Sequence, residues 1–214
     1  MNYMNVPDLL WSTTIISLSK IERSGITMNG IYISGYFTEE DHRILDELKN
    51  ELEENGIQLR CRDLTGSMMQ SALDFIDIDL VELGWEFIKA LAIKGGTGLV
   101  IFWIKKLWKL ITKDRETPVP FTLSISGIPS ITGTENIKCK ISGPLSDDAK
   151  EIAILKGYEL ASKIEEHQYQ LLEKDIYYTA VNAHLFRYDP ERETYSEMDI
   201  AAEVRKKQEE NTHA

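Results

Sequence analysis

The sequence predicts an α+β protein in which a mixed β-sheet carries two long helices, packed mainly on one face. Stretches rich in β-branched residues alternate with segments whose apolar residues recur every three to four positions. Several connections are short enough for hairpins, which favours a mixed sheet over a purely parallel one. Hydrophobic residues make up 43% of the 214 residues, enough for a substantial core. A ferredoxin-like arrangement is the most economical version of this order.

The first elements form a β-α-β stretch. Residues 13–33 have the composition of β structure, and a further strand is predicted over 31–37. Thr38 is a suitable N-cap for the helix that follows, whose apolar residues repeat at helical spacing opposite a charged face. The dipeptide Asn55-Gly56 ends this helix, because asparagine and glycine tolerate the left-handed conformation of a C-terminal cap. A strand over 57–64 completes the unit.

The segment 79–113 is the most unusual part of the chain. Asp79 is placed to cap an apolar helix, and the glycine-rich residues 95–98 indicate a break between two helices or a close packing point. Four lysines close the segment. Its longest nearly uncharged run, 90–104, is fifteen residues long, whereas a membrane-spanning helix needs about 20. A simple transmembrane helix is therefore not predicted.

The second half repeats the alternation of strands and helices. We predict a strand over 119–126, a loop over 127–136 and another strand over 137–142. A long helix then starts after Ser146 and runs to about residue 172. Residues 176–188 return to strand composition until Asp189-Pro190 breaks them.

These elements divide into three parts. Residues 1–126 form an α/β unit with a central apolar helix, and 127–198 form a β-α-β extension packed on the same sheet. Residues 199–214 are predicted to be a frayed helix or disordered tail.

Charge and cysteine usage limit the class of protein. The net charge is −11, and the only cluster with a strong basic excess, residues 94–115, holds six bases and one acid. A chain this acidic is a poor general nucleic-acid binder, so no nucleic-acid partner is predicted. Two isolated cysteines form neither a disulfide framework nor a metal-ligand spacing, and no signal peptide is recognisable. We expect a cytoplasmic protein.

Candidate catalytic and metal-binding residues are few. The histidines, His42, His167, His184 and His213, lie far apart in the sequence and match no catalytic or metal-binding spacing. The aspartates at 74, 77 and 79 are the most metal-like cluster, although capping and solvation explain them as well. The glycines at 95–98 lack the Gly-Lys-Ser/Thr ending of a phosphate-binding loop. We therefore predict no catalytic residue, no metal site and no cofactor.

The basic end of the central segment has three interpretations. A helix pair buried against the sheet is the simplest, because each half is amphipathic with a wide apolar face. An amphipathic helix over 94–113, rich in tryptophan and lysine, could instead lie in a membrane interface. Its surface could also bind a partner protein. The residues predicted to contact a partner or membrane are Trp103, Lys105, Lys106, Trp108 and Lys109.

The order of elements over 28–126 resembles a known family. A strand at 31–37, a helix at 44–52, a loop at 66–68, small residues at 95–98 and a Trp-Lys end at 103–108 follow one another. In this order the span resembles the effector-associated constant components of bacterial conflict systems. The resemblance implies a non-enzymatic adaptor that accompanies an effector protein. It carries over no site residue and covers less than half of the chain.

Three functions follow from the sequence. The first is a non-catalytic interaction or adaptor protein, an accessory component of a bacterial defence or immunity module, whose partner is an effector or a second copy of the chain. The second is a peripheral membrane-binding protein that uses residues 94–113. The third is a small metal- or nucleotide-dependent enzyme that uses the aspartates before residue 80.

Overall fold

The computed structural model describes residues 30–35, 37–63, 80–93, 95–112, 121–174, 176–199 and 201–202. Within these ranges, seven strands form one mixed sheet in the order β2-β1-β3-β4-β5-β6-β7. The α+β class and the mixed sheet are thus confirmed. The strands are β1 (Gly30–Gly35), β2 (Gln58–Asp63), β3 (Leu80–Gly84), β4 (Phe121–Ser130), β5 (Gly133–Ile141), β6 (His184–Asp189) and β7 (Thr194–Glu197). The helices are α2 (Glu39–Glu54), α3 (Trp85–Ile93), α4 (Thr97–Thr112), α5 (Asp147–Glu165) and α6 (Ile176–Val181).

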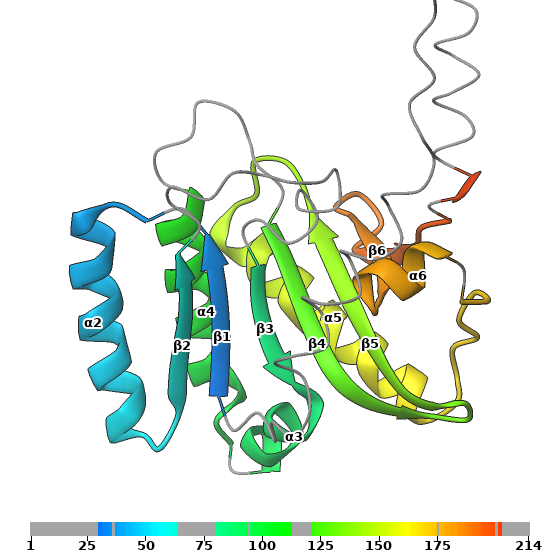
Figure 1. Ribbon diagram of the computed structural model, residues 1–214, viewed down its shortest axis with the longest axis horizontal. Helices are drawn as coiled ribbons and strands as arrows, with labels where there is room; N and C mark the ends of the chain where they lie inside the picture. The colour runs from blue at the N-terminus through cyan, green and yellow to red at the C-terminus, as the bar shows by residue number, and fades with distance from the viewer. Residues whose placement is uncertain are drawn as a thin grey trace, which may run out of the picture.

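Parallel and antiparallel pairs alternate across the sheet (Figure 1). Strands β1 and β2, β3 and β4, and β5 and β6 are parallel pairs, and each is connected through helices. The pairs meet antiparallel, as β1 with β3 and β4 with β5. In a ferredoxin-like fold the βαβ units are split. Here the two strands of each unit hydrogen-bond directly, so the ferredoxin-like detail is not confirmed.

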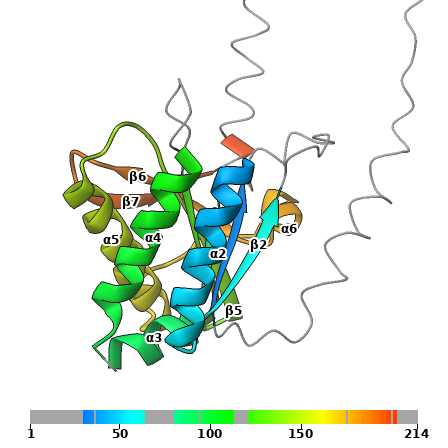
Figure 2. The same ribbon diagram turned by 90° about the vertical axis from the view of Figure 1, so that its left-hand side faces the viewer.

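Helices α2, α4 and α5 lie side by side on one face of the sheet, with α4 in the middle (Figure 2). They contain 16, 16 and 19 residues, so the described part has three long helices where the sequence predicted two. The core lies between this layer and the alternate strand residues that point toward it. Ile33, Val81, Leu83, Leu123 and Ile125 are all completely buried. No helix in the described ranges is long and apolar enough to cross a membrane.

Local sequence signals predicted both ends of helix α2 correctly. The Thr38 side chain accepts from the Asp41 backbone, and the Asp41 carboxylate accepts from the Thr38 backbone, which is a capping box. Gly56, with φ of 73°, follows the C-terminal residue as predicted. The predicted strand at 57–64 is β2. The predicted β structure before residue 30 lies outside the described residues.

Four sequence predictions are wrong. Residues 80–84 are strand β3 and not helix, because Val81 and Leu83 alternate with Glu82 and pair between β1 and β4. Most of 127–136 is strand, since a bulge at Gly127 (φ of 77°) lets β4 continue to Ser130.

The other two errors lie in the second half. Helix α5 ends at Glu165, where His167 turns the chain with φ of 60°. Residues 176–181 form helix α6 despite their strand composition. Strand β7 was not predicted. Residues 203–214, most of the predicted tail, lie outside the described residues.

Candidate functional site

The predicted contact residues divide between two faces of α4. Trp103 and Trp108 are 0% and 5% exposed, and the Trp108 ring stacks on Phe121 with centroids 4.1 Å apart. The tryptophans therefore form core contacts with the sheet. The three lysines lie on the opposite face of the helix, half-buried for Lys105 and exposed for Lys106 and Lys109.

Two apolar residues share that outer face with the lysines. At 100° per residue, Leu99, Phe102, Lys105, Lys106 and Lys109 fall within one arc of about 120°. We call these five residues the α4 outer face. Phe102 is 48% exposed and Leu99 is 42% exposed. The ammonium of Lys106 lies 4.7 Å from the Phe102 ring centroid, close enough for a cation–π contact.

Ion pairs fix this face between its neighbours. Lys106 Nζ lies 3.0 Å from Glu51 Oε2 on α2, and Lys105 Nζ lies 3.2 Å from Glu151 Oε2 on α5. Glu51 also accepts from the Trp103 indole at 3.2 Å. These bonds, with that of Trp103 first, hold the pKa of Glu51 below its usual value. These ion pairs hold the α4 outer face in place between α2 and α5.

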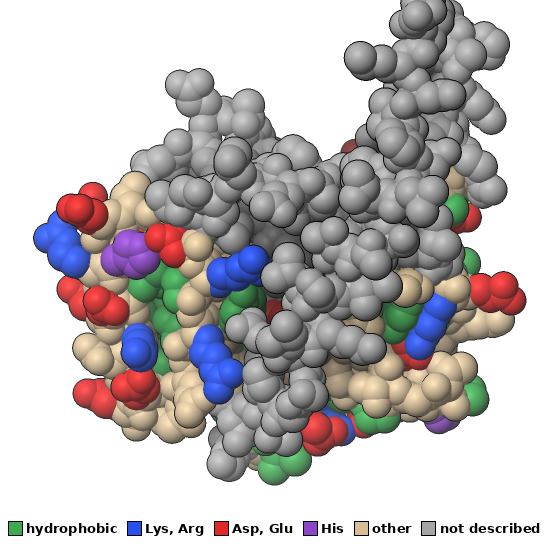
Figure 3. All heavy atoms as spheres, in the orientation of Figure 1, with side chains coloured by type: hydrophobic (Ala, Val, Ile, Leu, Met, Phe, Trp, Pro, Cys, Tyr) green, Lys and Arg blue, Asp and Glu red, His purple; other side chains and the backbone are tan. Residues whose placement is uncertain are grey.

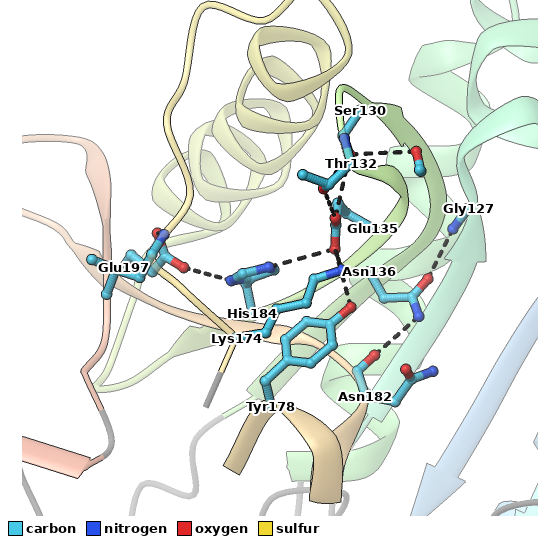
Figure 4. Close-up of polar contacts among 12 residues, drawn as sticks. Gly127, Ser130, Thr132, Glu135, Asn136, Lys174, Tyr178, Asn182, His184 and Glu197 are labelled. Atoms are coloured by element: carbon cyan, nitrogen blue, oxygen red, sulfur yellow. Dashed lines mark hydrogen bonds and ion pairs between the residues drawn. The ribbon is translucent and has the colours of Figure 1, made fainter. Parts of the chain in front are cut away.

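A second candidate lies at the β5-β6-β7 end of the sheet, around a buried histidine (Figure 4). His184 begins β6, Glu135 lies on β5 and Glu197 ends β7. The strand register puts all three on the same sheet face, because His184 pairs with Ile137 and Phe186 pairs with Glu197. Their side chains are 5%, 0% and 6% exposed.

The two carboxylates bracket the imidazole. Glu197 Oε1 lies 2.7 Å from His184 Nδ1, and Glu135 Oε2 lies 3.5 Å from Nε2. The second contact does not have the geometry of a hydrogen bond, so Nε2 is buried without a hydrogen-bond partner among the described residues. Figure 4 shows the ring lying between the two acids.

Glu135 gathers most of the hydrogen bonds in the cluster. It accepts from Lys174 Nζ at 2.8 Å, Tyr178 Oη at 3.0 Å and Thr132 Oγ1 at 2.7 Å. Burial by itself would raise the pKa of Glu135, but these bonds outweigh it and lower the pKa to about 2. The hydrogen bond from Lys174 to Glu135 also raises the pKa of Lys174.

The geometry of this cluster indicates a structural role. A general base needs a ring nitrogen that can face a substrate, whereas a carboxylate stands on each side of His184. Glu197 also accepts from the Leu172 backbone at 3.0 Å, so the cluster holds the chain after α5 against the sheet. In the described part of the chain, no group of three or more histidine, cysteine, aspartate or glutamate residues is arranged to hold a metal ion.

The other residues considered from the sequence are not brought together. His42 pairs with Asp63 at 3.0 Å on the surface, and His167 is exposed at the end of α5. Gly95 and Gly96 separate α3 from α4, which is the helix break that the sequence indicated. His213 and the aspartates at 74, 77 and 79 lie outside the described residues.

Sequence reasoning missed Phe102 and the partners of His184. Phe102 could have been found, since a helical wheel of 97–112 places it among the lysines. The Glu135 cluster has no such signal, because its members come from four elements that only the sheet order brings together. Comparisons with family models, curated proteins and solved structures gave no match to this chain.

Proposed function

We infer that this chain is a non-catalytic interaction protein, an adaptor whose partner contacts the α4 outer face. The observation that carries this proposal is Phe102, an aromatic ring that is half exposed in the middle of the helix layer. Aromatic side chains are enriched where proteins bind one another. Its exposure costs solvation free energy that a partner would recover.

The apolar surface extends onto α5. Glu165 near the end of α5 binds Trp85 and Lys89 of α3, and Glu151 near its start binds Lys105, so α4 and α5 run antiparallel. Leu155, 41% exposed, follows Glu151 by one turn, on the stretch of α5 that lies beside Phe102. Leu99 and Phe102 on α4 and Leu155 on the neighbouring α5 thus expose apolar surface next to the lysines of the α4 outer face, and we infer that they form one protein-binding patch.

The partner is another protein, either an effector or a second copy of this chain. The resemblance of residues 28–126 to effector-associated constant components supports an accessory role in a bacterial defence module. Cys61 and Cys139 are both free thiols, and Cys61 is exposed, which fits a reducing cytoplasm.

Peripheral membrane binding remains a prediction, and a vesicle test decides it. The apolar face that such binding would use contains Trp103, which is completely buried and donates to Glu51 of α2. Insertion would require α4 to leave the core, at a cost of several kcal/mol. The metal- or nucleotide-dependent enzyme also stays a prediction, since its aspartates lie outside the described residues.

The test is Phe102→Asp, a substitution on a half-exposed side chain that should leave the fold intact. Ile131→Asp is the matched control, since Ile131 is 81% exposed on the β4–β5 turn. Each variant is co-expressed with the proteins encoded beside this chain, and stoichiometric complexes are measured by light scattering after size-exclusion chromatography. Self-association is followed by sedimentation velocity.

We expect wild type and Ile131→Asp to form the same complex, and Phe102→Asp to weaken it by at least about tenfold. An adaptor role through α4 is refuted if wild type forms no complex, or if Phe102→Asp binds as tightly as wild type. Flotation of wild type with anionic vesicles, lost in Phe102→Asp, would favour the membrane function.

A further inference from the structure

Strand β2 ends the sheet on the side of α2 (Figure 1). Five of its six residues are exposed, and Leu59 is the exception. No strand within the described ranges pairs with the outer side of β2. An edge strand of this kind presents backbone N–H and C=O groups that another extended chain can pair with.

Two arginines mark this edge. Arg60 pairs with Tyr32 and Arg62 pairs with Ser34. These pairs alternate with those of the buried residues Ile31 and Ile33, which face the helices, so the two arginines lie on the opposite face of the sheet. Figure 3 views this face and shows Lys and Arg side chains near β1 and β2, beside acidic side chains of α2. Successive same-face residues on a strand are about 6.6–6.8 Å apart, so the two guanidinium groups form a short cationic row.

These arginines differ from most lysines of the helices. Neither forms an ion pair with any described residue, although the net charge is −11 and carboxylates abound. Six lysines of the helices, by contrast, lie within 3.2 Å of a carboxylate: Lys89, Lys105, Lys106, Lys150, Lys156 and Lys163. An arginine fork without a carboxylate partner is suited to bidentate recognition of one.

A second copy of this chain is a poor occupant of the edge. Antiparallel pairing of β2 with its own copy must match residues that share a face. Centring the pair on Arg60 places Arg60 opposite itself, and centring it on Cys61 places Arg60 opposite Arg62. Like charges directly opposite one another destabilise a strand pair, so both of the longest registers are disfavoured.

We propose that the β2 edge binds an extended acidic segment of a partner protein, which adds to the sheet as a further strand beside β2. Carboxylates at alternate positions of that segment face Arg60 and Arg62, while its backbone pairs with β2. A nucleic acid cannot supply that backbone pairing, and the acidic first turn of α2, with Glu39, Glu40 and Asp41, repels a long polyanion. This surface is separate from the α4 outer face and can bind whether or not that face does.

The probes are labelled peptides of about eight residues whose affinities are measured by fluorescence anisotropy. In the first, glutamate alternates with threonine. The second has glutamine in place of glutamate, and the third keeps the glutamates but has proline at the alternate positions, which removes backbone donors. A single-stranded DNA oligonucleotide of similar charge is the fourth. The protein variants are Arg60→Thr/Arg62→Thr and, as a control, Arg192→Thr, whose side chain is 82% exposed on the β6–β7 turn.

The first peptide should bind and the other three should bind at least about tenfold more weakly. The double arginine variant should lose about tenfold in affinity, and Arg192→Thr none. Hydrogen exchange should slow at the amides of residues 58–63 in the complex only. The proposal fails if the glutamate peptide does not saturate the protein, if the proline peptide or the DNA binds equally well, or if residues 58–63 gain no protection.

Discussion

Glu135 shows how one buried charge can organise an end of this sheet. Its carboxylate is completely buried, yet it is fully paired with an ammonium, a phenol and a hydroxyl from three different segments. Removing one partner from such a group leaves an uncompensated buried charge, which is far more costly than the pair is stabilising. The residue therefore fixes where Lys174 and Tyr178 must lie.

This arrangement predicts acid-labile stability that depends on Glu135. A carboxyl whose pKa is about 2 when folded and near 4.5 when unfolded binds fewer protons in the folded state. Its contribution is complete above about pH 5.5 and is lost as the pH falls toward 2. We expect Glu135→Gln to lower the free energy of unfolding by about 2–3 kcal/mol at pH 7, and by much less at pH 2.5.

Urea denaturation at both pH values measures this difference. Glu51, Glu159 and Glu165 also have lowered pKa values, so wild-type acid lability alone is not diagnostic. The quantity to compare is the gap between wild type and variant. Glu54→Gln, at an exposed position at the end of α2, is the control. An equal gap at pH 7 and pH 2.5 would contradict the pairing described here.

Some single residues could be predicted from the sequence and others could not. The Thr38 cap follows from contacts within four residues, so local chemistry determined it. The sequence grouped the two tryptophans of α4 with its lysines as contact residues, whereas Trp103 and Trp108 are buried in the core. His184 was visible in the sequence, but Glu135 and Glu197 lie 49 residues before it and 13 after it. Their meeting depends on the order of the strands, which no local pattern encodes.

At the scale of elements, glycine positions show where two segments approach closely. Gly30 opens β1 beside the start of β2, and a Cβ atom there would collide with the carbonyl oxygen of Gln58. That neighbour is backbone and cannot move without disturbing the β1–β2 pair. Gly98, in the first turn of α4, has open space around its position.

These two glycines predict opposite effects of the same substitution. We expect Gly30→Ala to destabilise the protein by about 2 kcal/mol or more, because the strands must separate to accommodate the methyl group. Gly98→Ala should stabilise it by about 0.5 kcal/mol, since alanine restricts the unfolded chain and favours the helix. Thermal unfolding of both variants measures this. Shifts of the melting temperature in the same direction would show that the β1–β2 approach is looser than described.

The predicted elements failed where packing overrode composition. Residues 176–181 are rich in aromatic and β-branched side chains, yet they form α6 and place Tyr178 on Glu135, 4.7 Å from the His184 ring centroid. Residues 80–84 carry a strand pattern too short to separate from the helix that follows. The contact of α6 is with Glu135, more than 40 positions away. The contacts of residues 80–84 are with the neighbouring strands β1 and β4.

At the scale of the whole molecule, the sheet joins both halves of the chain. The division predicted at residue 126 passes through β4, which pairs with β3 on one side and β5 on the other. Helix α5, from the second half, packs Gly157 against Leu123 of β4, and its Glu165 binds Trp85 and Lys89 from the first half. The sequence indicated β-α-β units over 31–64 and in the second half, but it missed β3 and therefore the unit that β3 forms with β4, and it did not give the order in which the units join.

This connectivity predicts that both halves unfold together. All four tryptophans lie between residues 11 and 108, so their fluorescence reports mainly the first half and the contacts that Trp85 and Trp108 make with α5. Cys139 is completely buried on β5 and becomes reactive only when the second half opens. In a Cys61→Ser background Cys139 is the sole thiol, and its labelling can be followed across the same urea series. We expect the two midpoints to coincide, because breaking β4 from either neighbour exposes the core of both halves. Separate midpoints would instead mean that β4 can part from β5 and α5 while the first half stays folded, and the molecule would then be two units sharing one sheet.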